Sequence, residues 1–244
     1  MCVGQFFRGV AVLVLAPILT IATSIAGLLG IMVFGMSAVS AQRFPRFWAK
    51  LILMISGVTV TVKGGESLKN GNPYIFAGNH QSQFDIFAVQ GFLGHDFRWL
   101  AKKELFDVPI FGAALRRVGN ISVDRSHSRA AVKSLDEAAQ RIAAGTSVLI
   151  FPEGTRSKDG QLLPFKSGAM VLAIKAGVPV VPMAIVGTHA VLPKGRLLAK
   201  SGQVVIRLGE PIETSGYKVK QKHELAERLQ AEVAALIAEE QRNG

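Results

Sequence analysis

Cysteine is almost absent from this 244-residue sequence, which contains only Cys2. A single cysteine excludes an intrachain disulfide, and such a composition is typical of a reducing compartment. Charged residues are also scarce, at 18% of the chain against 49% hydrophobic residues. Aromatic residues make up only 7%, so the apolar excess is aliphatic. A low charged fraction with an aliphatic excess indicates contact with a membrane.

Two kinds of binding motif are missing from the sequence. Apart from His80, which is discussed below, the histidines are scattered without the spacing of a metal site, so we predict no catalytic metal. They are His95, His127, His189 and His223. The formal net charge is +11, yet no nucleic-acid-binding motif accompanies it, and we expect no nucleic-acid partner. A basic chain with an apolar segment suits an anionic membrane surface and phosphate-bearing substrates instead.

A long uncharged segment occupies the N-terminal part of the chain. Residues 9–42 contain no Asp, Glu, Lys or Arg, whereas a helix needs about 20 apolar residues to cross a bilayer. The segment would form either one tilted span or a bent hairpin that enters one leaflet and returns, with bends at Pro17 and near Gly27–Gly30. We therefore predict a membrane-embedded helical segment at residues 1–42 and an α/β domain at residues 43–244.

The charges that flank this segment predict its orientation. Arg43, Arg46 and Lys50 follow it, and only Arg8 precedes it, so the positive-inside rule places the following domain in the cytoplasm if the segment spans. A cleaved signal peptide is the alternative. The segment is far longer than the roughly 7–15 apolar residues of such a signal, which argues against cleavage.

Strand and helix patterns alternate through the rest of the chain. Strands are predicted at residues 57–63, 74–77, 97–101, 121–123, 148–151, 178–186 and 203–208. Helices are predicted at residues 84–93, 127–144, 167–176 and about 221–240. This alternation predicts an α/β domain with a mixed, largely parallel sheet flanked by helices. Functional sites in such domains form in the loops beyond the carboxyl ends of the strands.

The first such loop is Asn79–Asp85, in which His80 follows a strand and Asp85 opens a helix. A turn between strand and helix lets the carboxylate reach back to the imidazole. A neutral imidazole can remove the proton from an attacking hydroxyl, and a carboxylate on its other nitrogen fixes the tautomer. Ser82 raises the alternative of a serine hydrolase, although no Gly-x-Ser-x-Gly elbow surrounds it.

The second loop is Phe151–Ser157, after the buried strand at residues 148–151. Gly154 permits a tight turn that exposes its polar neighbours. The planar fork of Arg156 suits bidentate phosphate binding, and Thr155 adds a hydroxyl donor. Glu153 is expected to orient Arg156 or to hold a substrate hydroxyl.

Further cations stand at the ends of other predicted elements. Lys102 follows the strand at residues 97–101, and Arg125 ends the strand at residues 121–123. Lys166 precedes a helix whose N-terminus would attract an anion. A solvated surface charge is the alternative for each of them.

Taken together, these residues resemble the glycerolipid acyltransferase family, and within it the bacterial lysophosphatidic acid acyltransferases. Four blocks match in the family's order. They are Asn79–Asp85 (His-x4-Asp), Gly119–Arg125 (Gly-x5-Arg), Phe151–Ser157 (Phe-Pro-Glu-Gly-Thr-Arg-Ser) and the apolar, proline-containing Val178–Ile185. The likeness covers roughly residues 57–210. Each block is a weak signal alone, but the four in sequence are specific.

The resemblance implies roles for most of the candidate residues. It implies His80 as the general base and Asp85 as its orienting acid. It also implies acceptor binding through Glu153, Gly154, Thr155 and Arg156, with Arg125 at the substrate phosphate. Lys102 and Lys166 are expected to assist in binding that phosphate. Family members use acyl-CoA or acyl-carrier protein as the acyl donor and need no metal or tightly bound cofactor.

The expected function is transfer of a fatty acyl group to the sn-2 hydroxyl of 1-acyl-glycerol 3-phosphate, which gives phosphatidate. The expected location is a bacterial inner membrane, with the catalytic part on its cytoplasmic face and membrane lipids as partners. Alternatives are a different acceptor, such as glycerol 3-phosphate or a lyso-aminolipid, a lipid serine hydrolase, and a membrane-surface binding protein without turnover.

Overall fold

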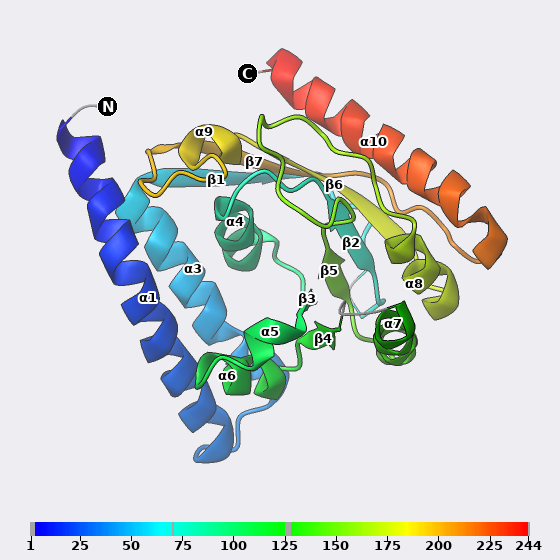
Figure 1. Cartoon of the computed structure of the whole chain (residues 1–244), viewed down its shortest axis with the longest axis horizontal. Helices are drawn as coiled ribbons and strands as arrows, with labels where there is room; N and C mark the ends of the chain where they lie inside the picture. Colours follow the sequence, from blue (N-terminus) through cyan, green and yellow to red (C-terminus); the bar gives the residue numbers. More distant parts are fainter. Residues whose placement is uncertain (1–2, 70, 125–127, 244) are drawn as a thin grey trace.

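The computed structural model describes residues 3–69, 71–124 and 128–243. It shows a layered α/β body with a helical hairpin along one side (Figure 1). Helix α1 (Val3–Met32) runs along the outside of the molecule, and α3 (Arg43–Ser56) returns beside it after the short α2 (Ala38–Ala41). We call residues 3–56 the N-terminal hairpin.

The two arms of the hairpin pack closely. The indole Nε1 of Trp48 donates to Thr20 Oγ1 across the arms at 3.0 Å. A Cβ on Gly30 would stand 2.7 Å from the sulfur of Met36 and 3.1 Å from the ring of Phe44, so glycine permits this close approach. The helix runs unbroken through Pro17, and the chain turns only after Met32. The predicted alternative of a hairpin with both arms inside residues 9–42 does not match the structure, because the returning arm is α3.

Helix α3 was not predicted from the sequence, where its cations served only as signals of orientation. In the structure two of these cations contact the body: Arg46 donates to the His95 carbonyl at 3.0 Å, and the Lys50 ammonium lies 5.3 Å from the centre of the Phe92 ring. The helix ends at Gly57, whose φ of 71° gives the left-handed cap common at helix C-termini. Residue 42, the predicted domain boundary, thus lies within the hairpin.

The predicted α/β architecture is confirmed. Seven strands form one sheet in the order β1-β7-β6-β2-β5-β3-β4. Every neighbouring pair is parallel except β6 and β7, which are antiparallel. The strands are β1 (Val58–Lys63), β2 (Ile75–Gly78), β3 (Arg98–Lys102), β4 (Ile121–Val123), β5 (Val148–Ile150), β6 (Val180–Val186) and β7 (Gly202–Leu208). The carboxyl ends of β2, β5, β3 and β4 therefore share one edge of the sheet.

Helices cover both faces of this sheet (Figure 1). They are α4 (Phe84–Phe92), α5 (Lys103–Phe106), α6 (Phe111–Arg117), α7 (Ser128–Ala143), α8 (Gly168–Ala176), α9 (Thr188–Val191), the 3₁₀ helix η1 (Val219–Gln221) and α10 (Lys222–Asn243). Because side chains alternate along a strand, Phe76 joins the core under α4 and the hairpin, whereas Ile75 joins the core under α7, α8 and α10.

Candidate active site

His80 and Asp85 meet at the carboxyl end of β2. The imidazole Nδ1 lies 2.7 Å from Asp85 Oδ2. The same oxygen accepts the backbone N–H groups of Gln81 at 2.7 Å and Ser82 at 2.8 Å. Asp85 is fully buried in the first turn of α4, where the positive end of the helix favours a carboxylate. The strand-turn-helix geometry thus brings the two residues into contact, and the side chain of His80 stays 16% exposed.

The Ser82 hydroxyl is not placed to act as the nucleophile of a serine hydrolase. Its side chain is fully buried, and its hydroxyl donates to the carbonyl of Leu192 at 2.7 Å. The hydroxyl oxygen accepts the N–H of Phe84 at 3.1 Å, at the start of α4. The hydroxyl therefore bonds two backbone groups and stabilises the turn before α4, as Ser side chains commonly do.

The loop Phe151–Ser157 holds His80 from both sides. The Phe151 ring stacks on the imidazole with a centre-to-centre distance of 4.0 Å and an interplanar angle of 4°. The Oε1 of Glu153 accepts the backbone N–H of His80 at 2.8 Å, and the N–H of Ser157 donates to the His80 carbonyl at 2.8 Å. Three contacts from one loop therefore fix the ring and the backbone of His80.

Glu153 is 2% exposed, and its position differs from the one predicted. Its described side-chain hydrogen bond comes from the backbone amide of His80, so it supports the His80 backbone instead of orienting Arg156. Burial raises the pKa of Glu153 to about 7. The backbone amides of His80 and Leu163 lower this pKa, and the charge of Asp85 raises it. The sequence marked Glu153 as functional but gave no sign of this contact.

Of the predicted cations, Lys166 lies next to the loop Phe151–Ser157, whereas Lys102 has no hydrogen bond to that loop among the described residues. Lys166 stands over Gly154: its ammonium lies 2.9 Å from the point that a Cβ on that glycine would occupy. Gly154, with φ of 72°, thus lets the lysine approach the loop next to Thr155 and Arg156. Lys102 is exposed at the end of β3, at the same edge of the sheet. In the described part of the chain, no hydrogen bond joins Lys102 to this loop. Arg125 lies outside the described residues.

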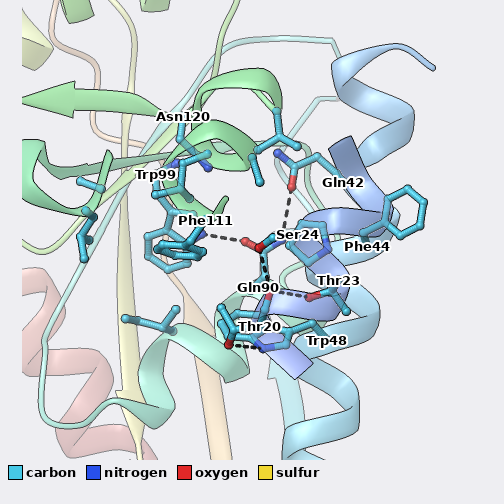
Figure 2. Close-up of a pocket in the computed structure, with 18 of the residues that line it drawn as sticks. Thr20, Thr23, Ser24, Gln42, Phe44, Trp48, Gln90, Trp99, Phe111 and Asn120 are labelled. Atoms are coloured by element: carbon cyan, nitrogen blue, oxygen red, sulfur yellow. Dashed lines mark hydrogen bonds between the residues drawn. The ribbon is translucent and has the colours of Figure 1, made fainter. Parts of the chain in front are cut away.

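An apolar cavity opens beside His80. It has a volume of about 250 Å³ and lies between the hairpin and β3, α4 and α6. Figure 2 shows Gln90, Trp99 and Gln42 together in its wall. The Trp99 indole donates to Gln90 Oε1 at 2.7 Å, and Trp99 N–H donates to Asn120 Oδ1 at 2.9 Å, so these buried polar groups are bonded to one another. The sequence could not reveal this cavity, because four separate segments form it.

The chain matches the family model described as Acyltransferase over residues 59–186. Because this match covers more than half of the sequence, the chain belongs to the Acyltransferase family.

Its relatives include proteins named 1-acyl-sn-glycerol-3-phosphate acyltransferase. The chloroplastic BAT2 protein of Brassica napus is 36% identical over 176 residues, which cover 70% of this chain and 51% of that protein. The alpha protein of Ovis aries is 32% identical over 189 residues, which cover 77% and 66% of the two chains. The chain thus spans about half the length of the Brassica relative.

A crystal structure of similar fold is that of the 1-acyl-sn-glycerophosphate (LPA) acyltransferase PlsC from Thermotoga maritima. It superposes with a TM-score of 0.66 at 28% identity, and the match covers 91% of this chain and 97% of that one. The match is longer than the α/β body alone, so it extends into the N-terminal hairpin.

Proposed function

We propose that this protein transfers a fatty acyl group from a thioester carrier, acyl-CoA or acyl-carrier protein, to the free sn-2 hydroxyl of 1-acyl-glycerol 3-phosphate, and so makes phosphatidate. The observation that carries the proposal is the His80–Asp85 pair, locked to the loop Phe151–Ser157 at the mouth of an apolar cavity. The names of the relatives give the same activity.

The chemistry follows from the ring nitrogens of His80. Nδ1 faces Asp85, which leaves Nε2 as the atom that takes the proton from the acceptor's hydroxyl. The hydroxyl oxygen bonds to the thioester carbonyl carbon, the carbon–sulfur bond breaks, and the thiolate leaves with the proton that His80 received. The buried carboxylate of Asp85 fixes the tautomer and stabilises the imidazolium that forms in between.

The substrates are assigned from the surroundings of His80. The acyl chain of the donor would lie in the apolar cavity, whose lining is largely hydrocarbon from the hairpin and the body. The phosphate of the acceptor would lie at Thr155, Arg156 and Lys166, with Lys102 at the same edge of the sheet. Arg125, outside the described residues, is proposed as a further phosphate ligand from the resemblance alone. A guanidinium binds two phosphate oxygens at once, which suits Arg156 to this role.

We further propose that the hairpin seats the protein in a bacterial inner membrane with the α/β body on the cytoplasmic face. Helix α1 is long and apolar enough to cross a bilayer. The tip between the two arms exposes large apolar side chains, of which Phe34 is 77% exposed. Because α3 returns toward the body, entry into one leaflet suits this shape better than a full span does. The acceptor could then reach His80 without leaving the bilayer.

An acyl-transfer assay with a panel of lyso-acceptors and both donor carriers tests the proposal. His80→Ala should lower kcat by about 10²–10⁴-fold, the usual contribution of a general base, with unchanged circular dichroism. His223→Ala removes an exposed histidine on α10 and should keep full activity. Full activity in His80→Ala, or release of free fatty acid in place of phosphatidate, would overturn the assignment.

A further inference from the structure

A loop that belongs to none of the four family blocks also touches the candidate site. It follows α9 and comprises Leu192–Gly195, which we call the α9 loop. Pro193 pairs with Ser82 in an isolated antiparallel bridge, and Ser82 Oγ donates to the Leu192 carbonyl at 2.7 Å. The α9 loop is thus bound to the turn that carries His80.

Lys194 extends from this loop to the second block. Its Nζ donates to Thr155 Oγ1 at 3.1 Å and to the carbonyl of Arg156 at 2.9 Å. Both acceptors are neutral, so the positive charge of the ammonium stays uncompensated. An ammonium has three N–H donors, and the third has no described partner.

The cations around Thr155 share this lack of a counter-ion. In the described part of the chain, Lys194, Arg156 and Lys166 form no ion pair with a carboxylate. Elsewhere the chain pairs its lysines readily, as with Lys63, Lys103 and Lys175. Among the described residues these three cations, from three separate segments, have no carboxylate partner, and together they create a positive potential that favours a multiply charged anion.

We propose that Lys194 is an acceptor-binding residue that donates its third N–H to the phosphate monoester of the lysolipid, beside the segment Gly154–Arg156, which Lys166 also approaches. This inference rests on the proposed function and adds a phosphate ligand from outside the family blocks. The two bonds to the loop hold the ammonium in place before the acceptor arrives, so little side-chain freedom is lost on binding.

The first experiment compares steady-state kinetics of Lys194→Met with those of the wild-type protein. The KM for 1-acyl-glycerol 3-phosphate should rise about 10-fold to 100-fold, the effect expected when a hydrogen bond to a charged group is lost. The KM for the acyl donor should not change. Lys194→Arg keeps the charge and should recover most of the acceptor affinity.

Lys200→Met is the matched control, since Lys200 is an exposed cation nearby in the chain and the change removes the same charge. It should keep the wild-type KM for both substrates. An equal rise of the acceptor KM in Lys194→Met and Lys200→Met would mean that the overall positive charge, and not a specific contact of Lys194, attracts the acceptor. A fall in kcat at constant KM would mean that Lys194 only supports the loop. Either result overturns the proposal.

A binding measurement separates this proposal from the proposed function. Glycerol 3-phosphate, which carries the same phosphate monoester, should raise the unfolding temperature of the wild-type protein and of Lys200→Met but not that of Lys194→Met. If the wild-type protein transfers no acyl group, the proposed function fails. The thermal shift still tests separately whether Lys194 binds the phosphate monoester. An equal shift in all three proteins would refute this role of Lys194.

Discussion

At the scale of single residues, Glu153 has an unusual electrostatic setting. Its Oε1 holds the His80 amide, while its Oε2 is buried without a hydrogen-bond partner among the described residues. Burial raises its pKa to about 7, so the carboxyl group can take up a proton near neutral pH. Protonation leaves Oε1 free to accept from His80. The hydrogen bond from the His80 amide to Glu153 therefore persists in both the protonated and the ionised form of Glu153.

This raised pKa makes stability depend on pH. Between the ordinary value of 4.5 and about 7, the folded protein binds more protons at Glu153 than the unfolded chain does. The contribution of this residue to the free energy of unfolding therefore falls as the pH rises through that window, by roughly 3 kcal/mol in total. Glu153→Gln keeps an acceptor for the His80 amide but does not titrate.

Urea unfolding of wild type and Glu153→Gln at pH 5 and pH 8 measures the effect. The variant should gain stability relative to wild type as the pH increases, by up to that amount. Parallel pH profiles for the two proteins would show that Glu153 stays ionised in the folded state. Transfer activity should survive in Glu153→Gln better than in Glu153→Ala, which removes the acceptor.

The sequence predicted part of this site for a physical reason. The contact of His80 with Asp85 follows from a turn between a strand and a helix, which the local pattern reveals. The backbone contact of Glu153 and the ammonium of Lys194 depend on how separate loops pack, and no local pattern encodes that packing. The expectation that Glu153 orients Arg156 is not matched among the described residues, where Glu153 accepts from the His80 backbone instead.

At the scale of elements, one buried carboxylate binds the last helix to two strands. Glu240 of α10 accepts from Lys63 of β1 at 2.7 Å and from Arg207 of β7 at 2.7 Å. Glu240 is 6% exposed. Its neighbour Glu239 also pairs with Arg207 but is far more exposed. The two adjacent glutamates therefore differ in burial and in the second cation, Lys63, that Glu240 binds.

Glu240→Ala should lower the free energy of unfolding by about 1–3 kcal/mol, because it leaves two cations without their buried partner. Glu239→Ala should cost less than about 1 kcal/mol, as expected for an ion pair near the surface. Thermal or urea unfolding of both variants measures the difference. Equal losses would contradict the assigned role of burial.

Some of these elements could be predicted from the sequence and others could not. Strands β2, β5 and β6 are short apolar runs that stop at glycine, proline or polar residues, and their positions matched within about two residues of the predictions. Helix α3 was missed because its arginines and lysine suggested a flank of the membrane segment. Its buried face, formed by Ala49, Ile52 and Leu53, becomes evident only when the body is present to cover it.

At the scale of the whole molecule, the turn between α1 and α3 forms the tip of the hairpin (Figure 1) and exposes large apolar side chains. Met32, Val33 and Phe34 are all well exposed there. A charge placed at this tip should weaken membrane binding, because Asp near the centre of a bilayer costs about 2.5–3.5 kcal/mol. We therefore expect Phe34→Asp to lower the fraction of protein that sediments with vesicles containing anionic lipids.

Val132→Asp is the control for this experiment. It places the same charge at an exposed position on α7, on the other side of the sheet from the hairpin. It should leave sedimentation unchanged. Equal sedimentation of Phe34→Asp and wild type would show that the tip does not enter the bilayer.

The hairpin also supplies much of the cavity lining, from Thr20 and Ser24 on α1 to Phe44 and Trp48 on α3. The hairpin that we propose seats the protein in the membrane therefore also shapes its interior, through residues other than those at the tip. Exchange of this segment for an unrelated membrane anchor would restore attachment and yet leave the cavity without one of its walls. Attachment and selection of the fatty chain are, in this architecture, properties that have to change together.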